Sequence, residues 1–212
     1  MHSTFLLITA SLFTAILALP APAPQPSPPG IPTASVAKSE LAGLTVAAQG
    51  PQTGYSRALF PHWIKISGKC NTRDEVLIRD GTNVVTNSAC ASTSGSWYSP
   101  YDGVTWTSAS DIQIDHFVPL SNAWKSGAAA WTTPQRQAFA NDLTNPQLVA
   151  ITGTVNESKG ERGPEDWKPS LTSFWCTYAE MWVKVKTVYD LTITSAEKSA
   201  LGKGFARRGR GR

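Results

Sequence analysis

The stretch "DIQIDHFVPL", residues 111–120, places Asp115 directly before His116. A neutral imidazole can accept a proton from water, and a carboxylate is a hard oxygen ligand for a cation such as Mg²⁺. The pair therefore suits hydrolysis at a phosphate, where water loses a proton and developing negative charge is stabilised. Considered alone, His116 would more often be a hydrogen-bonded core residue, and Asp115 could pair with an arginine.

Polar and apolar residues alternate over 111–115, as they do in a strand. A strand restricts how Asp115 and His116 could share one site. Neighbouring side chains on a strand point to opposite faces. Asp115 and His116 can therefore serve one site only where the strand ends or bends. Pro119 permits this, because proline interrupts a central ladder.

Further candidates follow in "FANDLTNPQLVAI" and "VNESKGERGPEDWKP". Asn145 is either a turn residue before a proline or a support for the site. Asn156 begins N-E-S, the one N-x-[ST] sequon in the chain, so glycosylation competes with a role as a ligand. Lys159 and Arg162 are candidates for binding a substrate phosphate, against the alternative of ordinary solvent-facing charge.

The set D-H-x-x-P-L, N-P-x-L-V and N-x-S-K-G resembles the His-Asn-His (HNH) endonucleases, and more narrowly the secreted proteins related to the C-terminal domain of GmrSD-type restriction enzymes (DUF1524-like). The resemblance covers about 56–201 and is carried by "HWI", "TRDEVLIRD", "SPYDG", "IDHFVPLSNAWKSGAAAW", "FANDL" and "NESKGERGPEDWKPS".

This resemblance implies a ββα-metal motif that holds one divalent cation, with Mg²⁺ expected ahead of Mn²⁺ or another ion. It implies that His116 is the general base and that Asp115 and Asn156 are metal ligands. Asn145 would match the middle asparagine, which holds the loop that presents the histidine. His62 and a histidine at position 2 are the other two in the chain, so His116 is the strongest candidate base.

Two departures from the family pattern stand out. Glu161 occupies the position after S-K-G where the family commonly has aspartate. The family often ends with a cysteine that partners the one in the long helix, whereas no cysteine follows Cys176 here. Among the three cysteines, the spacing in a secreted chain favours a structural bridge between Cys70 and Cys90.

The predicted architecture is α+β: a small antiparallel sheet with a ββα (HNH, His-Me finger) motif, packed against C-terminal helices. Strands are predicted at 75–80 and 83–86, joined by a turn at Asp80-Gly81, and at 111–115 and 146–151. Helices are predicted from Thr133, from around 155, and as the longest element over 171–191. Thr194 and Glu197 match a capping box.

Composition divides the chain into four parts. Residues 1–19 are predicted as a secretory signal peptide, 20–54 as a proline-rich linker or pro-segment, 55–201 as the nuclease domain, and 202–212 as a basic tail. We expect a secreted, extracellular monomer that leaves the membrane once the signal is removed.

The formal charge of +4 resides in the tail, because the remainder carries −1 once its five cations are set aside. Such a tail can bind nucleic acid without sequence preference, or it can simply be solvated. The sequence thus predicts a secreted, metal-dependent, non-specific endonuclease acting on DNA or RNA. The alternative is a secreted nucleic-acid-binding or effector protein that keeps the fold without hydrolysis.

Overall fold

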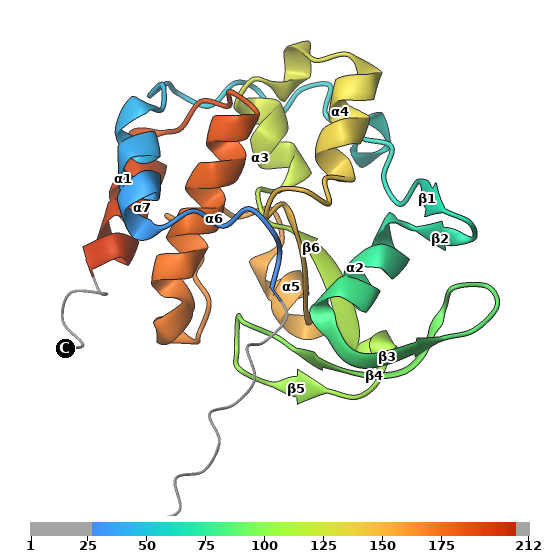
Figure 1. Ribbon diagram of the computed structural model, residues 1–212. Coiled ribbons are helices and arrows are strands. Elements are labelled where there is room, and N and C mark those ends of the chain that lie inside the picture. Colours follow the sequence, from blue (N-terminus) through green and yellow to red (C-terminus); the bar gives the residue numbers. More distant parts are fainter. Residues whose placement is uncertain (1–26, 207–212) are drawn as a thin grey trace, which may run out of the picture.

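The computed structural model describes residues 27–206, and the predicted signal peptide and positions 207–212 lie outside that range. The elements are α1 (Ala34–Gly43), η1 (Arg57–Leu59), β1 (Lys65–Ser67), β2 (Cys70–Asn71), α2 (Thr72–Asp80), β3 (Gly81–Thr86), β4 (Ser92–Tyr98), β5 (Thr105–Trp106), η2 (Ala109–Asp111), β6 (Ile112–His116), α3 (Leu120–Lys125), η3 (Ala128–Ala130), α4 (Thr133–Ala140), β7 (Leu148–Thr152), α5 (Gly153–Lys159), η4 (Thr172–Phe174), α6 (Trp175–Val188) and α7 (Ser195–Ala206). Helices α1, α6 and α7 lie together on one side of the molecule, and α2 lies on the other side with strands β1 to β4 (Figure 1).

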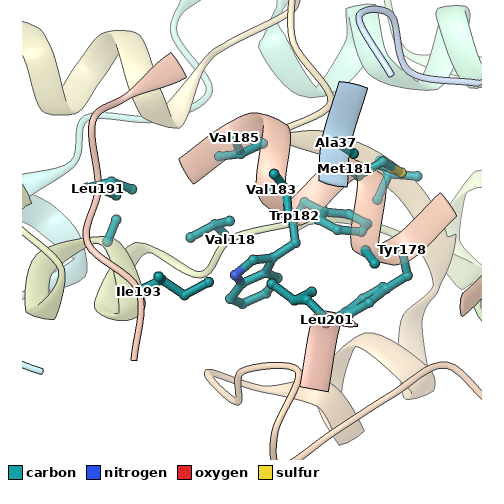
Figure 2. Packing of buried hydrophobic residues seen from close by; sticks show 14 of the residues in the cluster. Ala37, Val118, Tyr178, Met181, Trp182, Val183, Val185, Leu191, Ile193 and Leu201 are labelled. Carbon is teal, nitrogen blue, oxygen red and sulfur yellow. The ribbon is translucent and has the colours of Figure 1, made fainter. Parts of the chain in front are cut away.

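The larger core lies between α1, α3, α6 and α7. Trp182 on α6 is fully buried, and Figure 2 shows it among the side chains of Val118, Ile193 and Leu201. Burying each aliphatic side chain of this kind contributes roughly 1.5–3 kcal/mol. The predicted long helix is confirmed as the longest described helix, although it begins at Trp175, after the short turn η4.

The strands β6 and β7 form an antiparallel pair that is buried on both faces. Their register sets Asp115 opposite Val149 and His116 opposite Leu148. One face packs Ile112 and Ile114 into a second apolar cluster beneath α2 and β4. The other face meets the larger core, so all five residues of β7 are buried. Along the chain, α3, η3 and α4 lie between the two strands, and the helix α5 follows β7 directly.

The predicted strand at 75–80 is wrong, because these residues belong to helix α2. A capping box begins this helix: Asp74 N–H donates to Asn71 Oδ1, and Asn71 N–H donates to Asp74 Oδ2. Val76, Leu77 and Asp80 are buried at helical spacing. No separate turn joins two strands here, since Gly81 is both the helix cap and the first residue of β3.

The strand predicted at 83–86 is confirmed as part of β3, within the three-stranded sheet β3-β4-β5. The predicted bridge is also confirmed: Cys70 and Cys90 form a disulfide. It ties the start of α2 to the loop before β4. The strands expected at 111–115 and 146–151 correspond to β6 and β7, and the capping box of Thr194 and Glu197 is present at the start of α7.

Folded structure extends beyond the limits expected for the nuclease domain. Residues 34–43 fall in the range predicted as linker or pro-segment, yet they form α1, whose Ala37 and Leu41 join the larger core. At the other end α7 continues to Ala206, and Phe205 is buried. Proline enrichment stops near position 32, and the Thr33 side chain caps the start of α1.

Within residues 27–206, none of the helices has the length and apolar character needed to cross a bilayer.

Candidate active site

A cleft of about 190 Å³ lies beside the end of β6 and brings together three of the predicted site residues. Asp115, His116 and Asn156 all line it. In the described part of the chain β6 pairs with β7 alone, and its last three residues, Ile114, Asp115 and His116, line the cleft. The strand also ends at His116, with Pro119 three residues later. Because the strand ends there, the neighbouring side chains of Asp115 and His116 can both reach the cleft, as a shared site requires.

Asp115 is buried and strongly held. Lys159 Nζ lies 2.9 Å from its Oδ1 and 2.8 Å from its Oδ2, and the Tyr101 hydroxyl donates to Oδ2 at 2.6 Å. These contacts leave Oδ1 with one fewer donor than Oδ2. A carboxylate oxygen can accept about two hydrogen bonds. The remaining capacity of Oδ1 is thus the natural place for a further ligand.

His116 is buried, and its tautomer follows from its partner. Nε2 lies 2.9 Å from the backbone oxygen of Ala140, at the end of α4. A carbonyl oxygen only accepts, so Nε2 carries the proton and the neutral ring keeps its lone pair on Nδ1. No hydrogen bond engages Nδ1 within residues 27–206. His116 therefore presents a proton acceptor.

Burial lowers the pKa of His116 from 6.5 to about 3. The hydrogen bond to the Ala140 carbonyl opposes this shift, while the positive charges of Arg57, His62 and Lys159 lower the pKa further. The ring is consequently uncharged at neutral pH, the state in which it can accept a proton.

Lys159 lies behind Asp115 and away from the cleft. Its side chain is fully buried, and the ammonium also contacts the backbone oxygens of His116 at 3.2 Å and Phe117 at 3.0 Å. The three N–H donors of the ammonium face four acceptor oxygens, so no donor remains for a substrate phosphate. In this arrangement Lys159 fixes the position of Asp115 and the end of β6. Burial lowers its pKa and the Asp115 charge raises it.

Asn156 lies on α5 and is oriented by β6. Its Nδ2 donates to Gln113 Oε1 at 2.9 Å, which leaves Oδ1 with no donor among the described residues. Gln113 in turn donates to Glu157 at 2.9 Å. These hydrogen bonds hold the Asn156 side chain in place, and Asn156 lines the same cleft as Asp115.

Asn145 does not line the cleft. Its Nδ2 donates to Asp142 Oδ2 at 2.9 Å, and its backbone N–H donates to Asp142 Oδ1 at 3.0 Å. Asp142 also accepts a hydrogen bond at 2.8 Å from the hydroxyl of Tyr189, the residue that caps the end of α6. Asn145 thus shapes the loop that enters β7, at a distance from the reacting groups.

Gln147 was missed by the sequence reasoning, yet it holds the residues that follow His116. Its side-chain oxygen accepts from Val118 N–H at 3.1 Å, and its Nε2 donates to Val118 O at 2.9 Å. Its backbone oxygen accepts from Phe117 N–H at 2.7 Å. The signal available was a polar residue between Pro146 and an apolar strand, a place where a fully buried amide needs partners.

Arg162 and two unpredicted residues complete the surroundings. Arg162 Nε donates to Lys159 O at 3.1 Å, beyond the end of α5. Arg57 and Glu161 both line the cleft, with opposite charges. Glu161 stands in the turn after Gly160, whose φ of +56° suits glycine. Nothing in the sequence around Arg57 marked it as part of a site.

The donor set fits a hard divalent cation with few protein ligands. In the described range, no three His, Cys, Asp or Glu side chains gather as a metal-binding group. Asp115 and Asn156, two residues with oxygen donors, line one cleft, which suits Mg²⁺ because that ion usually keeps several waters. A zinc site would need three or four nitrogen or sulfur ligands.

Comparison with known proteins adds an independent observation. A family model, described as the C-terminal domain of GmrSD restriction endonucleases, matches residues 72–203. The chain belongs to this GmrSD C-terminal domain family. An "Uncharacterized secreted protein" from Arthroderma benhamiae is 67% identical over 201 residues, covering 95% of this chain and 97% of that protein. No solved structure matches.

The matched part of this GmrSD-type domain includes the cleft residues Asp115, His116 and Asn156, while Arg57 lies before it. The predicted family resemblance is thereby confirmed. The predicted extracellular location is confirmed too, by the secreted relative and by the Cys70–Cys90 disulfide.

Proposed function

We propose that this protein is a secreted, metal-dependent endonuclease that hydrolyses phosphodiester bonds in DNA or RNA. The observation that carries the proposal is that His116, whose Nδ1 keeps a lone pair, lines one cleft together with Asp115 and Asn156, two residues with oxygen donors. Membership of a restriction-endonuclease domain family supports the same reaction class.

His116 acts as the general base. Nδ1 takes a proton from a water molecule in the cleft, and the oxygen of that water attacks phosphorus as the bond to the 3′-oxygen breaks. The Ala140 carbonyl holds Nε2–H and thereby keeps the lone pair on Nδ1. The products are a 5′-phosphate and a 3′-hydroxyl, which takes up a proton from solvent.

Asp115 and Asn156 would hold the divalent cation. When bound, that ion stabilises the negative charge that develops on the phosphate and the departing oxygen. Lys159 and Tyr101 keep the Asp115 carboxylate at the end of β6, and Gln113 turns the Asn156 amide. The role of Lys159 in this scheme is to position a ligand, in place of the phosphate contact that the sequence favoured.

The decisive test is digestion of plasmid DNA and of RNA with Mg²⁺, with EDTA, and with the His116→Ala variant. We expect cleavage with Mg²⁺, none with EDTA, and a rate about 10²- to 10⁴-fold lower for His116→Ala, because one proton acceptor is lost. His62→Gln is the matched control. It replaces a ring whose centroid lies 6.1 Å from the centroid of the His116 ring and that does not line the cleft. The cleavage rate of this variant should stay within about fivefold of the wild type.

Purified protein that leaves both nucleic acids intact with Mg²⁺, Mn²⁺ and other divalent ions would overturn the proposal. That result would favour the non-catalytic binding or effector protein instead. Equal loss in His116→Ala and His62→Gln would also count against the assigned base, since it would indicate a general disturbance of the fold.

A further inference from the structure

The segment 55–64, here called the arm, precedes the matched family domain and forms one wall of the cleft. Helix α4 anchors it. Arg136 Nε donates to Leu59 O at 2.9 Å, and Asn141 Nδ2 donates to Pro61 O at 2.8 Å. Ile64 N–H returns a hydrogen bond to Asn141 Oδ1 at 3.2 Å. These long-range contacts fix the arm to the same helix whose last carbonyl orients His116.

Aromatic packing brings the arm close to the catalytic histidine. The Trp63 and His116 ring centroids are 5.4 Å apart, and the planes are tilted by 32°. Further along, Tyr55 packs edge-on against Trp124 of α3 at 6.1 Å. The arm is therefore held at both ends. Its residues Tyr55 and Arg57 line the cleft together with Asp115 and His116.

Arg57 is the residue of the arm with the donors to bind an anion. Among the described residues that line the cleft it alone carries a positive charge. It is exposed, and no hydrogen bond or salt bridge engages its guanidinium anywhere in residues 27–206. Lys159, by contrast, donates its ammonium hydrogens to Asp115 and to backbone oxygens, and Arg162 does not line the cleft.

The charge balance of the cleft makes such a residue necessary. The Asp115 charge is offset by Lys159 behind it, and Glu161 adds a negative charge on the cleft itself. A polyanionic substrate therefore meets one cationic side chain there. A guanidinium presents a planar fork that matches two phosphate oxygens, and its charge persists at every physiological pH.

We propose that Arg57 binds a backbone phosphate of the nucleic-acid substrate beside His116, so that the arm supplies a substrate contact from outside residues 72–203, the part that the family model matches. This inference rests on the proposed function for the identity of the substrate. It goes beyond that function in assigning phosphate recognition to the arm, in place of Lys159 and Arg162.

The test separates binding from cleavage. The background is full-length His116→Ala protein in EDTA, and the probes are short fluorescein-labelled DNA and RNA oligonucleotides, titrated at several salt concentrations. Adding Arg57→Ala should weaken binding about 10- to 100-fold, because a charged hydrogen-bonded contact is lost. The slope of log affinity against log salt should fall by about 1. Arg57→Lys should recover part of the affinity.

Lys65→Ala is the matched control, because Lys65 is an exposed cation just past the arm, on β1, that does not line the cleft. It should leave affinity within about twofold of the background and the salt slope unchanged. Affinity and slope that are the same with and without Arg57 would overturn the inference. So would an equal loss from Lys65→Ala, which would indicate a diffuse charge effect.

The two proposals fail separately. If wild-type protein cuts nothing while Arg57→Ala still lowers the oligonucleotide affinity and its salt dependence, the endonuclease assignment falls and the phosphate contact stands. If wild-type protein cuts nucleic acid and Arg57→Ala binds normally, the endonuclease stands and the phosphate contact falls.

Discussion

Residues 27–206 contain two buried lysine–carboxylate pairs, and the pairs differ in what lies beside them. Lys159 meets Asp115 between β6 and α5, and Lys186 meets Glu197 between α6 and α7. Both lysines are fully buried. Glu197 is also fully buried, and its second oxygen accepts from Thr194 N–H at 2.8 Å in the capping box. Asp115 instead lines a cleft, with capacity left on Oδ1.

The comparison shows how one chemical pair can serve two purposes. Buried pairs gain little net stability over apolar residues, although removing one partner is costly because the other charge is left buried. The Lys186–Glu197 pair is closed on all sides by Asn122, Ser126 and Thr192 O, which is what a structural cross-link between helices requires. The Lys159–Asp115 pair is open on one side, which is what a ligand-bearing carboxylate requires.

The largest expected effect comes from removing each lysine in turn. Lys159→Met and Lys186→Met should each lower the free energy of unfolding by about 3–5 kcal/mol, because each strands a buried carboxylate. Urea unfolding measures this loss. Cleavage per folded molecule should fall at least tenfold in Lys159→Met and stay within about twofold in Lys186→Met. Equal effects on cleavage would erase the distinction between the two pairs.

A smaller effect should follow from removing one hydrogen bond beside each pair. Tyr101→Phe deletes the 2.6 Å bond to Asp115, and Ser126→Ala deletes the 2.8 Å contact with Lys186 Nζ. Each should cost about 1.5–3 kcal/mol of stability, since each partner is charged. Only Tyr101→Phe should change the Mg²⁺ concentration that gives half-maximal cleavage. A shift of the same size in Ser126→Ala would contradict the assignment.

Acid should weaken the cleft more than the helical pair. The folded pKa of His116 is about 3 and the ordinary value is 6.5, so between these pH values the unfolded chain binds the extra proton. Stability therefore falls as pH drops through this window, and the His116 contribution is about 2 kcal/mol between pH 7 and pH 5. Urea unfolding in EDTA at both pH values measures it.

The matched control for this pH effect is His116→Gln, which lacks the titrating ring and should lose about 2 kcal/mol less than the wild type over the same interval. An identical pH dependence in the two proteins would mean that the ring is not kept neutral by burial.

The smallest expected effect concerns Asn156, the head of the sequon. Its amide nitrogen already donates to Gln113, and α5 places it within a helix beside the cleft. We therefore expect active secreted protein to carry no glycan there, so that enzymatic deglycosylation leaves its mass and activity unchanged. A peptide map that finds glycan on Asn156 in active protein would remove this residue from the proposed ligand set.

Several elements were predictable because they depend on local chemistry. The capping box of Thr194 and Glu197, the start of α4 at Thr133 and the strand at 112–116 all follow from residues close together in the chain. The strand predicted at 75–80 failed for the complementary reason. Its apolar residues permit either period, and the Asn71–Asp74 cap upstream decided for a helix.

The candidate site was also predictable only in part. The spacing of Asp115, His116 and Asn156 and their residue types were evident from the sequence, and the fold brings all three to one cleft. The burial of Lys159 behind Asp115, the clamp of Gln147 on Val118 and the approach of Arg57 were not. Each of these contacts joins residues at least 29 positions apart, such as Gln147 and Val118.

The sequence by itself therefore determined the family, the disulfide, the secreted location and the group of residues suited to phosphate chemistry, because residue type and spacing carry that information locally. Only the tertiary structure decided which charged groups are paired inside the protein and which remain exposed to bind a substrate. Burial and partnership depend on chain segments distant in sequence, and these two quantities separate the enclosed ammonium of Lys159 from the exposed guanidinium of Arg57.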